Sequence, residues 1–78
     1  MELDQLLEII GGVMDLDPGK ITEDMTFKDD LCADSLDLFT IIDTVNEEFE
    51  IEIPTEKLEE IVTVGDAYEL IRGLFPED

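Results

Sequence analysis

Apolar residues recur at steps of three and four positions in three separate segments of the chain, and this spacing predicts amphipathic helices. The segments run from Leu3 to Met14, from about Ser35 to Phe49 and from about Val64 to Leu74. A shorter segment, Thr55 to about Ile61, lies between the last two. The sequence therefore predicts an all-α fold, a four-helix bundle with three longer helices and one short third helix, in a single domain of residues 1–78.

Polar residues stand where these helices are expected to begin, and their side chains can accept hydrogen bonds from free backbone N–H groups. Asp34 is the expected N-cap of the second helix, Thr55 of the third and Thr63 of the fourth. Asp66 follows Thr63 at the reciprocal position of a capping box. We expect the first helix to end at Asp17-Pro18-Gly19.

The apolar residues that share a helix face are expected to form the core. The long connection from Lys20 to Ala33 has its own apolar residues, which indicates that it is pinned to that core. Cys32 is expected to be a structural thiol, and the terminal Pro76-Glu77-Asp78 to fray. The expected core residues are Leu3, Leu6, Leu7, Ile10, Val13 and Met14; Ile21, Met25, Phe27 and Leu31; Leu38, Ile41, Ile42, Val45 and Phe49; and Val64, Ala67, Tyr68, Ile71 and Leu74, with Phe39 at the core or its rim.

The charge is strongly one-sided, with 23 Asp and Glu against 4 Lys and Arg and a net charge of -19. Such a field repels nucleic acid and anionic lipid and attracts basic protein surfaces. The chain has no His, which excludes Ser-His and Cys-His catalysis and His-ligated metal sites. An EF-hand loop starting at Asp15 fails, because its sixth and twelfth positions are Lys20 and Thr26. We expect no built metal site.

No stretch of the sequence is typical of a membrane span or a signal peptide. The apolar segment Leu3 to Met14 is interrupted by Asp4, Gln5 and Glu8. No run approaches the roughly 18 apolar residues that a membrane-spanning helix needs. The one Cys cannot form an internal disulfide. We expect a cytoplasmic protein with no membrane insertion.

Ser35 is the candidate site residue, and it is the only Ser in the chain. It stands where the long connection meets the predicted second helix, so its hydroxyl is expected to face solvent. A phosphate attached there would meet the positive end of the helix and free backbone N–H groups. The alternative is a serine that only caps the helix.

Four ordered segments of the chain resemble acyl carrier proteins. They are Thr26 to Asp37 around Ser35, Asn46 to Pro54, Thr63 to Ala67, and Asp17 to Ile21. The resemblance implies that a phosphopantetheinyl transferase moves 4′-phosphopantetheine from coenzyme A onto Ser35, within the Asp34-Ser35-Leu36 segment. It further implies that the thiol of this arm holds acyl groups as thioesters, and that synthase and acyl-transferring enzymes act on them. The chain itself is then expected to be a non-catalytic carrier, and we expect it to be a monomer.

The second helix is also expected to dock those enzymes. At about 100° per residue, Leu36, Thr40, Asp43 and Glu47 share one stripe opposite the buried face, and Asp37 and Glu48 flank it. Leu36 is expected to be an apolar anchor among charges that face basic patches on the partners. The family usually has Glu at position 40, Met at 43, Ala at 44 and Gly at 32. The differences at 40, 43 and 44 leave open whether the pathway is fatty acid synthesis or specialised polyketide synthesis.

The core is expected to admit a medium-length acyl chain between the first, second and fourth helices. Two other functions stay open. A peptidyl or aminoacyl carrier more often has a Gly-Gly pair where this chain has Cys32 and Ala33. An acidic protein that mimics nucleic acid in a basic cleft would need no exposed serine at a helix start.

Overall fold

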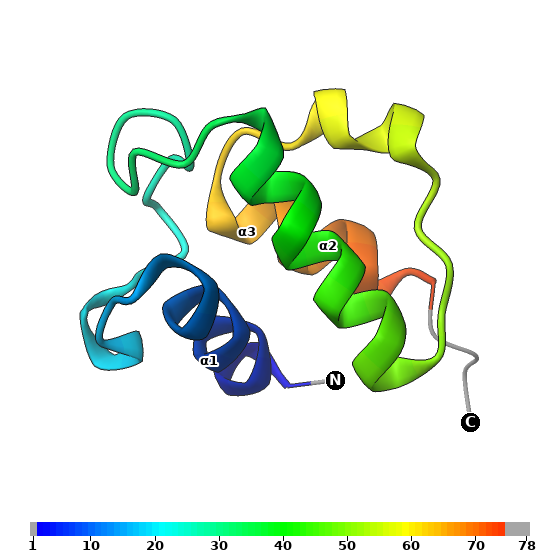
Figure 1. Ribbon diagram of the computed structural model, residues 1–78, viewed down its shortest axis with the longest axis horizontal. Coiled ribbons are helices and arrows are strands. Elements are labelled where there is room, and N and C mark those ends of the chain that lie inside the picture. The colour runs from blue at the N-terminus through cyan, green and yellow to red at the C-terminus, as the bar shows by residue number, and fades with distance from the viewer. Residues whose placement is uncertain (1, 75–78) are drawn as a thin grey trace.

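The structure is a computed structural model that describes residues 2–74. No helix within this range is both long enough and apolar enough to cross a membrane. The described elements are three α-helices and two short 3₁₀ helices, arranged as in Figure 1: α1 (Leu3–Met14), η1 (Pro18–Lys20), α2 (Ser35–Phe49), η2 (Thr55–Glu60) and α3 (Val64–Arg72). The predicted helical bundle is confirmed, with η2 in the place of the short third helix.

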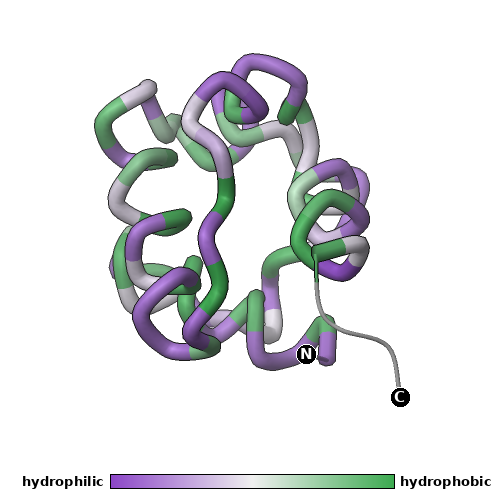
Figure 2. Tube along the Cα trace, turned by 90° about the vertical axis from the view of Figure 1, so that its right-hand side faces the viewer, coloured by the Kyte–Doolittle hydropathy of each residue, from purple (hydrophilic) through white to green (hydrophobic). Residues whose placement is uncertain are grey.

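The apolar faces of the helices and of the long connection meet in one core. Leu6, Ile10 and Ile41 are fully buried, and α1 packs against α2. The helices alternate between hydrophobic and hydrophilic residues along the chain, as Figure 2 shows, because only one face of each turns inward. The predicted core is largely confirmed. The buried residues that were predicted are Leu6, Ile10, Ile21, Phe27, Leu31, Ile41, Ile42, Val45, Val64, Ala67 and Ile71, and the core also buries Ala33, Ile53 and Ile61, which were not predicted.

α1 spans the predicted apolar segment from Leu3 to Met14, but it ends before Asp17-Pro18-Gly19, where the sequence predicted its end. Asp15 adopts the left-handed conformation (φ 61°), and the N–H of Leu16 bonds to the Gly11 carbonyl at 2.9 Å. The chain passes so close to Gly11 that a Cβ there would lie 2.6 Å from the Leu16 carbonyl oxygen. Asp17 therefore does not end α1 but caps the separate 3₁₀ turn η1.

The connection between α1 and α2 is fastened to the start of α3. The N–H of Val64 donates to the Met25 carbonyl at 2.9 Å, and the N–H of Gly65 donates to the Glu23 carbonyl at 3.0 Å. These are two of the first-turn donors of α3, which have no partner inside the helix. The connection thus supplies part of the cap of α3 and is held in a defined position.

The predicted start of the third helix is wrong in detail. Pro54, in an extended conformation, occupies the cap position, and Thr55 is the first residue of η2 rather than its cap. Within the described residues, no side chain of η2 is fully buried. η2 is a short 3₁₀ segment rather than an α-helix.

Two predicted core residues are exposed. α3 ends at Arg72, and Leu74 lies beyond it with 39% of its surface exposed. Phe39 is 47% exposed, because it lies on the outer side of α2 while Ile41 and Ile42 face inward. The predicted fraying of residues 76–78 falls outside the described residues.

Candidate functional site

The start of α2 is closed by a reciprocal pair of hydrogen bonds. The Asp34 Oδ1 accepts the N–H of Asp37 at 3.0 Å, and the N–H of Asp34 donates to the Asp37 Oδ2 at 3.4 Å. This confirms Asp34 as the N-cap. Ser35 is the first residue of the helix and is exposed, and its hydroxyl forms no hydrogen bond with any residue in the range 2–74. Ser35 therefore does not cap α2.

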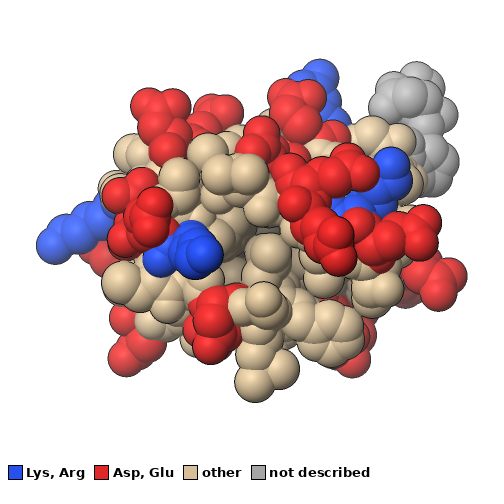
Figure 3. Space-filling view, turned by 90° about the horizontal axis from the view of Figure 1, so that it is seen from above, with Lys and Arg blue, Asp and Glu red and all other residues tan. Residues whose placement is uncertain are grey.

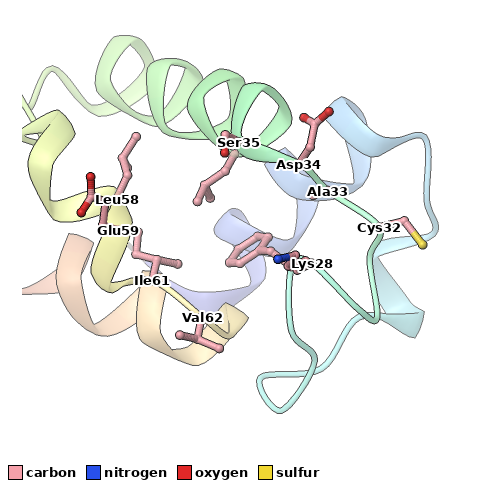
Figure 4. A pocket seen from close by; sticks show the side chains of 11 residues that line it. Lys28, Cys32, Ala33, Asp34, Ser35, Leu58, Glu59, Ile61 and Val62 are labelled. Carbon is pink, nitrogen blue, oxygen red and sulfur yellow. The ribbon is translucent and has the colours of Figure 1, made fainter.

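A cavity of about 570 Å³ adjoins Ser35. Its walls come from the start of α2, the connection before it, and the passage from η2 to α3. Figure 4 shows Ser35 on α2 above and Lys28 on the connection below. Six apolar residues and five others line the cavity: Phe27, Ala33, Leu38, Leu58, Ile61 and Val62, with Lys28, Cys32, Asp34, Ser35 and Glu59.

One wall of this cavity is held by backbone hydrogen bonds. The N–H of Phe27 donates to the Val62 carbonyl at 3.1 Å, and the Phe27 carbonyl accepts the N–H of Ala33 at 2.6 Å. Phe27 is 3% exposed, so these bonds are shielded from water. Because Ala33 lies two residues before Ser35, the bonded wall also fixes the approach of the chain to the site.

A tight turn in the connection shapes the same region. The Asp30 carboxylate accepts the N–H of Thr26 at 2.8 Å, and the Thr26 hydroxyl oxygen accepts the N–H of Asp29 at 3.2 Å. The N–H of Leu31 donates to the Thr26 carbonyl at 3.0 Å. Asp30 thus has a structural role that the sequence pattern did not reveal.

Residues 4–71 match the family model of the phosphopantetheine attachment site. The chain belongs to the phosphopantetheine-binding family of acyl carrier proteins. This carrier is also similar to a solved structure from Mycobacterium tuberculosis that is proposed to be an acyl carrier protein. The two are 33% identical with a TM-score of 0.83, and the match covers 95% of this chain and 100% of that one.

The family match establishes the cofactor of the carrier, a covalently attached 4′-phosphopantetheine. The residues present fit this group, because a free, exposed hydroxyl stands beside an apolar cavity. Carrier proteins of this kind generally do no catalysis themselves and interact with modifying and synthase enzymes. Among residues 2–74, no three Asp, Glu or Cys side chains converge on a metal site.

Cys32 differs from its sequence-based prediction. The residue is exposed, and Figure 4 shows its sulfur pointing away from Ser35. Its φ of 55° lies in the left-handed region, which strongly favours Gly. The backbone turn before the site imposes this conformation and directs the side chain outward, so the carrier has no structural thiol in its core.

The expected docking stripe lies on the outer side of α2. Leu36 is 72% exposed, and Thr40, Asp43 and Glu47 are exposed as well. The Thr40 hydroxyl donates to the Leu36 carbonyl at 3.0 Å, so this proton is used within the helix. Glu48 is exposed and Asp37 half-buried. The docking role of these residues stays a prediction.

The sequence pattern did not predict that Lys28, Leu58 and Val62 line a cavity beside Ser35. The expected place of an acyl chain, between α1, α2 and α3, stays a prediction; the cavity described above lies between the start of α2, η2 and the connection. Leu58 and Val62 follow the helix-breaking Pro54. The segment there is too short for its apolar residues to repeat and so to indicate which side of it is buried. No signal in the sequence pairs Lys28 with Ser35.

Proposed function

We propose that this carrier bears its 4′-phosphopantetheine arm on Ser35 and carries acyl intermediates in fatty acid or specialised polyketide biosynthesis. The domain of residues 1–78 acts as a shuttle between enzymes. Asp34 and Leu36 flank the attachment site and present Ser35 to the transferase. When bound, the group supplies a thiol that holds acyl chains as thioesters.

The observation that carries this proposal is that Asp34, and not Ser35, caps α2. The carboxylate of Asp34 caps the helix, and this leaves the Ser35 hydroxyl exposed and without a partner within residues 2–74. A serine that only stabilised the helix would use its own oxygen for the cap. Ser35 is also the only Ser of the chain.

The cavity supports a place for the cargo. Its apolar residues come from three parts of the chain, and its volume is in the range of small-molecule sites. A medium-length acyl chain on an arm rooted at Ser35 can leave water by packing against Phe27, Leu38 and Leu58. This packing would protect the thioester from hydrolysis.

The outer side of α2 supports a docking role. Leu36 is a large exposed apolar residue one position after Ser35, and on the face seen in Figure 3 acidic side chains clearly prevail over basic ones. Such a surface complements apolar pockets that are bordered by Lys and Arg. The proposed docking residues are Leu36, Asp37, Thr40, Asp43, Glu47 and Glu48, and Thr40 and Asp43 are proposed to determine which enzymes accept the carrier.

Intact mass spectrometry after reaction with coenzyme A and a broad-specificity transferase tests the attachment site. We expect the wild-type chain to gain one phosphopantetheinyl group, Ser35→Ala to gain none, and Thr22→Ala, which removes another exposed hydroxyl, to behave as wild type. A modified Ser35→Ala protein would refute the proposal. Separately, mass spectrometry of the acyl thioesters on protein isolated from its native cells would identify the pathway.

A further inference from the structure

Lys28 is an unpaired cation beside the modification site of a very acidic protein. It is one of only 4 Lys and Arg residues, which are outnumbered by 23 Asp and Glu. Lys57 has a partner, Glu60, at 3.7 Å. Lys28 forms no ion pair with any residue in the described range 2–74. It lines the same cavity as Ser35, and it is the only Lys or Arg that does so.

The surroundings of Ser35 are otherwise unfavourable for another negative charge. Asp34 precedes Ser35, and Asp37 lies two residues after it, so two carboxylates already occupy the positive end of α2. The N–H of Asp37, which a phosphate could otherwise bind, is taken by Asp34 at 3.0 Å. A phosphodiester on Ser35 would therefore meet like charges, and the helix start alone offers limited compensation.

We infer that Lys28 is the counterion that positions the phosphodiester of the arm on Ser35; this inference rests on the proposed function. The lysine ammonium is a compact charge on a flexible stem, and it can move toward a phosphate without disturbing the backbone. Lys28 follows Phe27, whose backbone is bonded to both Val62 and Ala33, so the base of the side chain is held firmly at the cavity wall.

An interaction of Lys28 with the phosphate would determine the direction in which the phosphopantetheine arm leaves Ser35. Lys28 and Ser35 lie on different walls of one cavity, as Figure 4 shows. A phosphate drawn toward Lys28 turns the root of the arm across the cavity rather than along the outer side of α2. Lys28 is thus a positioning residue, which biases the acyl chain toward the apolar lining and away from solvent.

Phosphorus NMR of the modified protein tests this inference. Four proteins are converted to the phosphopantetheine form: wild type, Lys28→Gln, Lys28→Arg and the control Lys20→Gln, which removes a cation that does not line the cavity. At low ionic strength we expect the ³¹P resonance to move in Lys28→Gln, to lie closer to wild type in Lys28→Arg, and to be unchanged in Lys20→Gln. At about 0.5 M salt, where charges are screened within several ångströms, the difference should shrink.

Proton NMR of the same samples gives a second readout. We expect nuclear Overhauser contacts between the Lys28 ε-methylene protons and the pantetheine methyl groups in wild type. A ³¹P resonance that is identical in wild type and Lys28→Gln would overturn the inference, as would an equal displacement in Lys20→Gln. These results differ from failure of the proposed function, in which mass spectrometry finds no group on Ser35. Thermal unfolding of each variant verifies that it is folded.

Discussion

The Asp34 carboxylate binds the backbone N–H of Asp37 at 3.0 Å, and this bond gives α2 its cap independently of Ser35. Asp34 therefore stabilises the helix, and the adjacent Ser35 is left for the attachment role that we propose for it.

The first prediction separates these two roles. Asp34→Ala should lower the free energy of unfolding of the unmodified protein by about 1 kcal/mol, because the cap is lost. Ser35→Ala should change it by less than about 0.5 kcal/mol, because the hydroxyl has no partner among residues 2–74. Urea denaturation measures both values. Equal losses in the two variants would show that Ser35 shares in the cap.

The second prediction concerns the backbone at Cys32. Its φ of 55° is costly for a residue with a Cβ and is readily adopted by Gly. Cys32→Gly should therefore raise the free energy of unfolding by roughly 0.5–1 kcal/mol. Cys32→Ala is the matched control, since it removes the sulfur but keeps the Cβ, and it should show no comparable gain. A gain of the same size in both variants would assign the effect to the thiol instead.

The third prediction is a pH dependence at the start of α3. The backbone N–H groups of Thr63 at 3.1 Å and Val62 at 3.2 Å donate to the Asp66 carboxylate and hold the pKa of Asp66 below its ordinary value. A carboxyl whose pKa is lowered on folding stabilises the protein above its unfolded-state pKa, near 4, and this stability is lost as the pH falls through the folded-state pKa.

Asp66→Asn should accordingly melt at a lower temperature than wild type at pH 7. The difference should shrink below about pH 4 and vanish once the wild-type carboxyl is protonated. Asp43→Asn is the control, because the Asp43 side chain forms no hydrogen bond within residues 2–74. Melting curves between pH 2 and 7 measure the effect, and a difference that persists unchanged at the lowest pH would contradict it.

The fourth prediction concerns the cargo. An octanoyl group on the arm should raise the melting temperature of the carrier and slow amide exchange at the cavity lining. The reason is that burial of the acyl chain in the cavity removes apolar surface from water and so stabilises the folded protein. Leu58→Gln should weaken both effects by making the lining polar. Leu16→Gln changes an exposed Leu that does not line the cavity and should leave them intact. Identical behaviour of acylated and unacylated wild type would place the chain in solvent.

The fifth prediction concerns docking on α2. Leu36→Ala should weaken binding to a partner enzyme by about 1–2 kcal/mol if Leu36 is the apolar anchor. Thr40→Glu with Asp43→Met should improve turnover by ordinary fatty acid synthesis enzymes and reduce turnover by a specialised partner. Steady-state rates of the two classes of enzyme, measured with the same acyl group on the wild-type and the doubly substituted carrier, give both turnover changes. If the double substitution leaves both rates unchanged, the outer side of α2 does not determine which enzymes accept the carrier, and the connection from Lys20 to Ala33 is the next segment to test.

The sequence by itself determined the helices, most of the core and the cap residues of α2 and α3. These features depend on local spacing and on side chains that bond within one turn, such as Asp34 with Asp37 and Thr63 with Asp66. Only the tertiary structure decided the left-handed backbone at Cys32, the exposure of Phe39 and the cavity beside Ser35. The cavity depends on contacts between segments that are distant in the chain, and the backbone at Cys32 depends on the turn that brings the N–H of Ala33 to the Phe27 carbonyl. The hydrogen bond from the N–H of Phe27 to the Val62 carbonyl joins two segments that line the cavity. These residues are far apart in the chain, so the spacing of apolar residues in the sequence cannot predict that they pair.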